Sequence, residues 1–68
     1  MSQTSTYTVT GMTCGHCVAS VTEEVQEIPG VEDVAVDLPT GAVTITSAEP
    51  LDEDAVRSAV EEAGYQLA

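Results

Sequence analysis

Two cysteines separated by two residues, Cys14 and Cys17, are the side chains of this sequence whose type and spacing could do chemistry. A disulfide between them would close almost no loop and would remove little entropy from the unfolded chain. Stabilisation of the fold by a disulfide bond is therefore a poor explanation for the presence of the pair. The N-terminus lacks a basic and then apolar signal segment. We therefore expect the protein to stay in the reducing cytoplasm with both thiols free.

Two thiols at this spacing, one in a loop and one in the first turn of a helix, can converge on one metal ion. The unpaired N–H groups at a helix N-terminus favour the thiolate over the thiol. Two thiolates without a built-in third or fourth ligand suit a soft ion of low coordination number, such as Cu(I). A structural zinc site needs four ligands, and His16 is the one further strong candidate in this segment.

Thiol–disulfide oxidoreductases use the same cysteine spacing, so the pair by itself leaves redox catalysis open as the alternative. Disulfide isomerases carry Cys-Gly-His-Cys, but they place a Trp before the first Cys and embed the motif in a longer thioredoxin fold. Here Thr13 precedes Cys14, and the expected order of elements differs. We therefore favour a metal-binding protein over an enzyme.

The periodicity of the sequence predicts the elements that must position the cysteines. Polar and apolar residues alternate over 6–10, 34–38 and 43–46, as in half-buried strands, and 65–68 is a short terminal strand. Apolar residues recur at helical spacing over 17–28 and 55–63. Pro29-Gly30 ends the first helix and 39–41 is a turn between strands, while Asp52 is the N-cap of the second helix and Gly64 ends it.

The resulting order is strand, helix, strand, strand, helix, strand. It predicts an α+β fold of the ferredoxin-like βαββαβ type, with a four-stranded antiparallel sheet and two helices on one face. The chain has 68 residues, of which 43% are hydrophobic. This length suits one two-layer domain, residues 1–68, with a single core.

The charge balance excludes several classes of partner. Twelve acidic residues face one base, Arg57, which gives a net charge of -11. Nucleic acids and anionic membrane surfaces bind through Lys and Arg, so neither is expected as a partner. No apolar run approaches the ~20 residues of a membrane span, so we expect no membrane insertion. A protein partner should present a neutral or basic docking face, although the acidity would also serve solubility alone.

The segment Gly-Met-Thr-Cys-x-x-Cys after a first strand resembles the signature of the heavy-metal-associated domain. This family includes small cytosolic copper chaperones and N-terminal domains of copper-exporting P-type ATPases. The likeness runs from Tyr7 to the Gly64-Tyr65 pair and includes Ile28-Pro29-Gly30-Val31. It implies that Cys14 and Cys17 bind one Cu(I) and pass it by ligand exchange to a copper-exporting P-type ATPase. It also implies a monomer, in a family where copper-bridged homodimers occur.

Four neighbours of the cysteines are accessory candidates. Thr13 stands where zinc, cadmium and lead members of the family often carry Asp, which favours Cu(I), and we expect it to cap the first helix. Met12 should pack in the core rather than bind metal. His16 is a third ligand, a tuner of the cysteine protons or a solvent-facing side chain, and an accessory role is favoured. The Tyr65 phenol would shield the metal. A carrier of mercury, zinc or cadmium is the alternative within the family.

Overall fold

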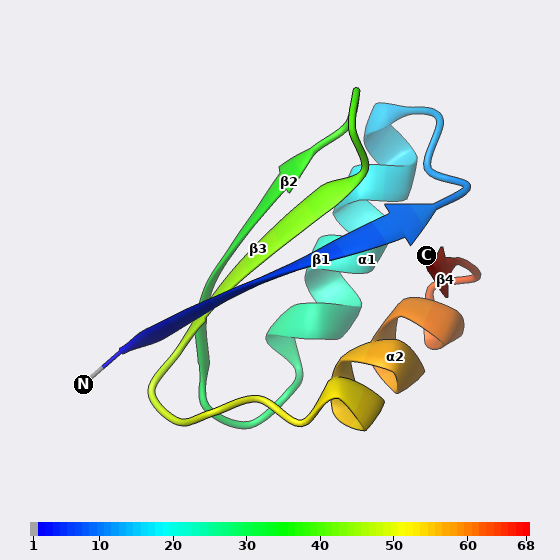
Figure 1. Ribbon diagram of the computed structural model, residues 1–68. Coiled ribbons are helices and arrows are strands. Elements are labelled where there is room, and N and C mark those ends of the chain that lie inside the picture. Colours follow the sequence, from blue (N-terminus) through cyan, green and yellow to red (C-terminus); the bar gives the residue numbers. More distant parts are fainter. Residues whose placement is uncertain (1) are drawn as a thin grey trace.

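The structure, a computed structural model, describes residues 2–68. Its elements follow the expected order: β1 (Gln3–Thr10), α1 (Gly15–Gln26), β2 (Val31–Asp37), β3 (Ala42–Ser47), α2 (Glu53–Glu62) and β4 (Gln66–Leu67). The strands form one antiparallel sheet in the order β2-β3-β1-β4, and both helices cover the same face of it (Figure 1). The predicted ferredoxin-like fold is confirmed. Within residues 2–68, neither helix has the length and apolarity to span a membrane.

Strand pairing extends two strands beyond the stretches of alternating sequence. β1 begins at Gln3 instead of residue 6, because its first residues pair with the end of β3, where Gln3 lies opposite Ser47. β2 begins at Val31 instead of residue 34. A register shift between Val31 and Asp33 interrupts the alternation of side chains in β2. An interrupted alternation hides a strand from a period-two pattern.

The first helix begins at a different residue from the one expected. Its N-cap is Cys14, which has an extended backbone (φ -156°, ψ 170°), so the prediction that Thr13 caps this helix is wrong. The Cys14 carbonyl accepts hydrogen bonds from the N–H groups of Cys17 at 3.1 Å and Val18 at 3.3 Å. No side chain caps this end of α1. In α2 the expected cap is confirmed, because the Asp52 carboxylate accepts from the N–H of Asp54 at 3.1 Å.

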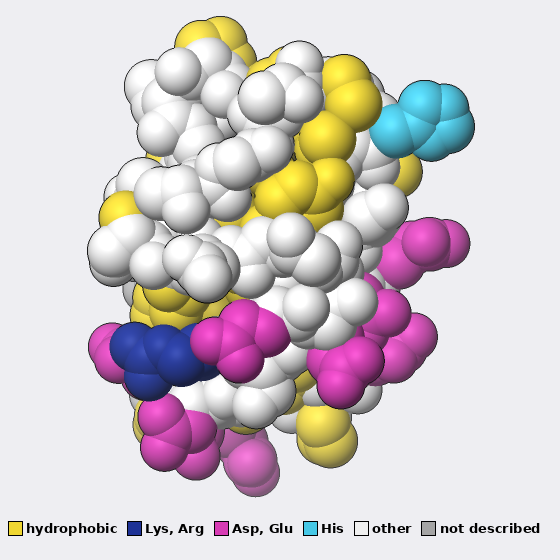
Figure 2. Space-filling model, turned by 90° about the vertical axis from the view of Figure 1, so that its right-hand side faces the viewer, with side chains coloured by type: hydrophobic (Ala, Val, Ile, Leu, Met, Phe, Trp, Pro, Cys, Tyr) yellow, Lys and Arg dark blue, Asp and Glu magenta, His cyan; other side chains and the backbone are white. Residues whose placement is uncertain are grey.

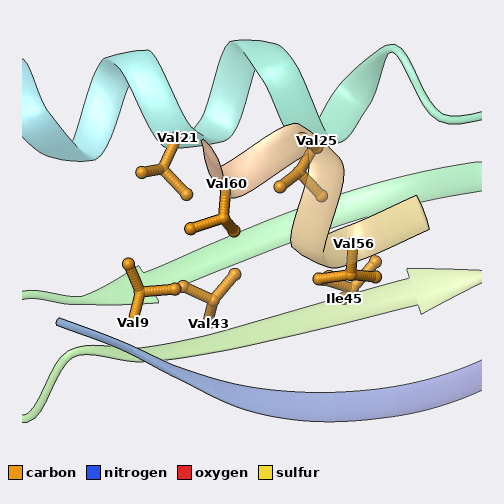
Figure 3. Packing of buried hydrophobic residues seen from close by; sticks show 8 residues of the cluster. Val9, Val21, Val25, Val43, Ile45, Val56 and Val60 are labelled. Carbon is orange, nitrogen blue, oxygen red and sulfur yellow. The ribbon is translucent and has the colours of Figure 1, made fainter. Parts of the chain in front are cut away.

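A core built almost wholly of valine holds the two helices against the sheet. Figure 3 shows side chains of both helices pointing at side chains of β1 and β3. The hydrophobic residues that are at most 3% exposed are Val9, Val21, Val25, Val43, Ile45, Val56 and Val60. Each fully buried side chain of this size contributes about 1.5–3 kcal/mol relative to an exposed one. Because Val21 anchors α1, the first turn of that helix, which carries Cys17, has a defined position above the end of the sheet.

Candidate metal centre

The two cysteines lie at the connection between β1 and α1. The loop 11–14 runs from the end of β1 to the start of α1, at the end of the molecule where β4 also lies (Figure 1). Cys14 is exposed, whereas Cys17, the third residue of α1, is 9% exposed. Their Sγ atoms are 3.0 Å apart, which places the two sulfurs in hydrogen-bonding contact. The expected arrangement of one loop cysteine and one helical cysteine is confirmed.

The surroundings of Cys17 favour its thiolate. They lower the pKa of the Cys17 thiol from 9.0 to about 6. The largest cause is a hydrogen bond from the Tyr65 side chain, followed by the backbone N–H of Thr13 and the side chain of Cys14. Burial opposes these effects, because it penalises the charged form, but it is the smaller influence. At neutral pH the metal-free protein therefore already presents a sulfur in the form that binds metals.

Tyr65 reaches this sulfur from the far end of the chain. It follows Gly64, which ends α2 with a positive φ of 95°. Gly11, in the cysteine loop, also has a positive φ of 92°, and a Cβ built there would lie 3.4 Å from Cδ1 of Tyr65. The pKa of Tyr65 is raised, first by its hydrogen bond to Cys17 and then by burial. The phenol therefore stays protonated, and its O–H donates a hydrogen bond to the Cys17 thiolate.

The other candidates contribute less to a metal site. Among residues 2–68, no His, Asp or Glu joins the two cysteines in a group of three that could hold an ion. His16 is exposed, and the histidine side chain (cyan) stands out from the surface in Figure 2. Met12 is half-buried and packs against the core, as expected. The geometry thus brings together Cys14, Cys17 and Tyr65.

Two contributors were not anticipated from the sequence. The first is the backbone around Thr13 and Cys14, whose N–H groups lower the pKa of the Cys17 thiol. The second is Gly11, which lets the ring of Tyr65 approach the loop. Neither can be recognised from a side-chain type in the sequence, because one is a set of backbone N–H groups and the other is a glycine. A glycine directly after a strand and before two cysteines does, however, indicate a sharply turned loop.

This fold and this pair of thiols define a class of small ferredoxin-like domains with a metal-binding loop before the first helix. Residues 6–66 match the heavy-metal-associated domain, and the chain belongs to that family. The family resemblance expected from the sequence is confirmed.

Similar proteins cover nearly the whole chain. COP-associated protein of Helicobacter felis is 39% identical over 59 residues, covering 87% of this chain and 89% of that protein. Copper chaperone CopZ of Bacillus subtilis is 38% identical over 64 residues and is covered to 93%, as is this chain. The solved structure of a CopZ metallochaperone superposes with a TM-score of 0.90 at 28% identity, covering 97% of this chain and 100% of that one.

Other matches are to short segments of long proteins. Copper-transporting ATPase 1 of Rhizobium meliloti is 37% identical over 59 residues, which are 87% of this chain and 7% of the ATPase. Mercuric reductase of Serratia marcescens is 36% identical over 58 residues, which are 85% of this chain and 13% of the enzyme. Domains like this one therefore occur both alone and within transporters and enzymes.

Proposed function

We propose that this protein carries Cu(I) on Cys14 and Cys17 in the cytoplasm and delivers it by ligand exchange to a copper-transporting P-type ATPase. The observation that carries the proposal is the pair of sulfurs 3.0 Å apart, one exposed and one buried. Within residues 2–68 no His, Asp or Glu is grouped with them as a third ligand. Family membership and the similarity to CopZ support the coarser statement that the protein is a non-catalytic metal carrier.

The donor set favours Cu(I) over the alternative ions. Thiolates are soft ligands, and two of them satisfy an ion that accepts low coordination. Zn²⁺ at a closed site takes four ligands, and the remaining positions here would have to be filled by water or by a partner. Thr13 offers a hydroxyl where a carboxylate would suit zinc or cadmium better. The absence of a carboxylate beside Cys14 is the reason to prefer copper to these ions.

The unequal exposure of the two cysteines suits transfer. Two sulfurs on opposite sides of one ion, each at about 2.3 Å as in zinc–thiolate bonds, lie about 4.6 Å apart. The pair, 3.0 Å apart, must therefore open to hold an ion in a near-linear two-coordinate geometry, and Cys14, which is exposed in the loop, is the member placed to move. A thiolate of the partner attacks the copper and forms a three-coordinate intermediate, after which the Cys14 bond breaks. One copper–sulfur bond forms for each that is lost, so transfer needs little net driving force.

Partner and compartment follow from the same features. Segments of two copper-transporting ATPases are similar to this chain. This similarity supports the proposal that the copper is accepted by a domain of such an ATPase that carries its own cysteine pair. The net charge of -11 supports a partner that is neutral or basic, and it argues against nucleic acid. Free thiols support the cytoplasm as the place of action. We take residues 1–68 as one domain that acts as a monomer, with copper-bridged dimers as a further form.

Competition with a coloured Cu(I) chelator under reducing conditions tests the proposal. Cys14→Ser and Cys17→Ser should each lose tight Cu(I) binding, because one thiolate remains to hold the ion. His16→Ala is the matched control, and it should keep the affinity within about threefold, because His16 is exposed and no group of three metal-binding side chains among residues 2–68 includes it. Wild-type affinity in Cys14→Ser, or tighter binding of Zn(II) than of Cu(I), would contradict the assignment.

Thiol–disulfide exchange is the second candidate, because the sulfurs touch and one pKa is lowered. In this structure, however, the thiol with the lowered pKa is Cys17, the buried member of the pair. Attack on a disulfide of another protein requires an accessible thiolate. We therefore expect no turnover in an insulin-reduction assay, and catalytic turnover would establish this second function instead.

A further inference from the structure

The acidity of this protein exceeds what solubility requires. A net charge of about 2–8 in magnitude keeps a small domain soluble when charges of both signs are interspersed on its surface. This chain has a net charge of -11, with twelve acidic residues, one arginine and no lysine. Arg57 pairs with Glu53 and Asp54, so the other ten acidic residues have no Lys or Arg to pair with.

The acidic residues are spread over the molecule instead of forming one docking face. They lie in and just after α1, in β2, in the connection before α2 and in α2 itself. Eleven of the twelve are exposed, and Glu24 is half-buried. Figure 2 shows acidic side chains (magenta) around the one basic side chain (dark blue). A single partner would cover only some of them, so docking does not account for their number.

The closest carboxylates repel one another at ordinary ionic strength. Glu23 and Glu27 are four residues apart at the C-terminal end of α1, and Glu24 and Glu27 are three apart. Residues at these spacings lie about 5–6 Å apart on a helix surface. The screening length is about 8 Å at 0.15 M salt and about 3 Å at 1 M. Their repulsion therefore persists at 0.15 M salt and is strongly weakened only in molar salt.

The core leaves little stability with which to offset this repulsion. Its buried cluster consists of valine, one alanine and one isoleucine, and the chain contains no Phe and no Trp. Small side chains remove less apolar area from water than Leu or Phe, and a domain of this length has a marginal core. Salts that are excluded from the protein surface strengthen the burial of apolar groups. Salt would thus support this fold in two ways, by screening and by stronger burial.

We infer that this protein folds and works in molar salt, and that its metal-free fold is marginal at ordinary ionic strength. The inference concerns the solution in which the protein acts, and it goes beyond the metal and the partner of the proposed function. Screening is the main contribution, because the carboxylates are numerous, clustered and largely without a basic partner.

Thermal unfolding of the metal-free, reduced protein in 0.15 M and 2 M KCl tests the inference. The Tm should rise by at least about 10 °C between these concentrations, which is a large change for a domain of this size. A five-site variant, which reduces the net charge from -11 to -6, identifies the cause. It combines Glu23→Gln, Glu24→Gln, Glu27→Gln, Glu61→Gln and Glu62→Gln. The variant should have a higher Tm than wild type at 0.15 M KCl and less than half of the wild-type rise.

Two controls separate screening from other effects. Ala19→Gln, Gln26→Ala and Ser58→Ala together change exposed helix positions without a change in charge, and this variant should keep the wild-type rise within about 3 °C. Sucrose added at 0.15 M KCl strengthens apolar burial without screening, so it should raise the Tm of wild type and of the five-site variant equally.

A wild-type rise of less than about 10 °C, or an equal rise in wild type and the five-site variant, would overturn the inference. A wild-type protein without a folded state at 0.15 M KCl that folds in 2 M KCl would support it. Because the protein is metal-free throughout, a failure here would leave the proposed function as it stands. Failure of Cu(I) binding by the folded protein in 2 M KCl would overturn the proposed function and leave this inference intact.

Discussion

Cys17 combines burial with ready ionisation, and its hydrogen bonds explain how. Burial alone would raise the pKa of a thiol, yet the Tyr65 side chain, the Thr13 backbone and Cys14 all lower it, to a net value of about 6. The helix N-terminus adds a favourable partial charge at the same place. The site therefore holds a thiolate before any metal arrives, and a metal does not have to displace a proton from Cys17 at neutral pH.

Replacing Tyr65 by Phe should move the titration of Cys17 upward, from about 6 toward the ordinary 9.0, because it removes the largest cause of the lowered pKa. Thiolate absorbance followed against pH in the metal-free protein measures this midpoint. Tyr7→Phe is the matched control, since Tyr7 packs on the core and is not among the causes of the shift. An unchanged midpoint in Tyr65→Phe would show that the phenol does not act on this sulfur.

The same pKa makes the stability of the metal-free protein depend on pH. A folded pKa below the unfolded one means that ionisation of Cys17 stabilises the fold, fully above pH 9.0 and progressively less as the pH falls to about 6. The free energy of unfolding should therefore decrease over this window. Denaturant titrations of wild type and Cys17→Ser measure it, and the variant should lack this part of the pH dependence.

Among the elements, the turn between β2 and β3 has the strictest steric requirement. Gly41 has a positive φ of 76°, and a Cβ built there would lie 2.5 Å from the carbonyl oxygen of Val9. The approach is close because the N–H of Val9 donates to the Gly41 carbonyl at 2.8 Å. This turn thus ties the β2–β3 pair to β1 near the point where β1 leads into the cysteine loop.

Gly41→Ala should lower the free energy of unfolding by about 2 kcal/mol or more, because it combines an unfavourable φ with a backbone clash. Chemical denaturation measures the change. Gly15→Ala is the control, since Gly15 has no positive φ and nothing within 4 Å of the added Cβ. That variant should be within about 1 kcal/mol of wild type, given the better helix propensity of Ala. Equal stability of the two variants would contradict the steric argument.

At the scale of the whole molecule, the net charge of -11 costs stability, and the cost is concentrated between the two helices. The pKa of Glu24 is raised, first by Glu27, then by burial, and then by Glu62 and Glu23. The single base does not relieve this cluster, because Arg57 pairs with Glu53 at 3.0 Å and Asp54 at 3.3 Å. Both ion pairs are exposed and contribute little.

Glu24→Gln should stabilise the protein at pH 7 and low salt, because it removes a carboxylate whose ionisation the fold disfavours. The sign follows from the raised pKa: the wild type loses stability as the pH rises above 4.5 and Glu24 ionises against its neighbours. Thermal unfolding should show a higher Tm for the variant and a smaller gain at about 1 M salt, where the screening length is about 3 Å.

Glu49→Gln is the matched control for this effect, because it removes the same charge outside the cluster of Glu23, Glu24, Glu27 and Glu62. Its gain in Tm should be smaller. The wild-type protein itself should become more stable as salt is added, since screening weakens the repulsion among twelve carboxylates. A Tm that is independent of salt would contradict this account.

The sequence by itself determined what depends on local order. Side-chain alternation predicted β1, β2 and β3, helical spacing predicted α1 and α2, and the Asp52 cap was predicted from the residue type at a helix start. The two cysteines, two residues apart, identified the candidate site and its ligand chemistry. These features can be predicted from the sequence because hydrophobic periodicity, turn-forming residues and the type of metal-binding side chain are properties of residues that are neighbours in the chain.

The tertiary structure decided what depends on residues far apart in the chain. It placed Tyr65 against Cys17, it made Cys14 rather than Thr13 the N-cap, and it extended β1 and β2 by strand pairing. Packing of the helices on the sheet brings these groups together, and no local pattern records which distant residues will meet.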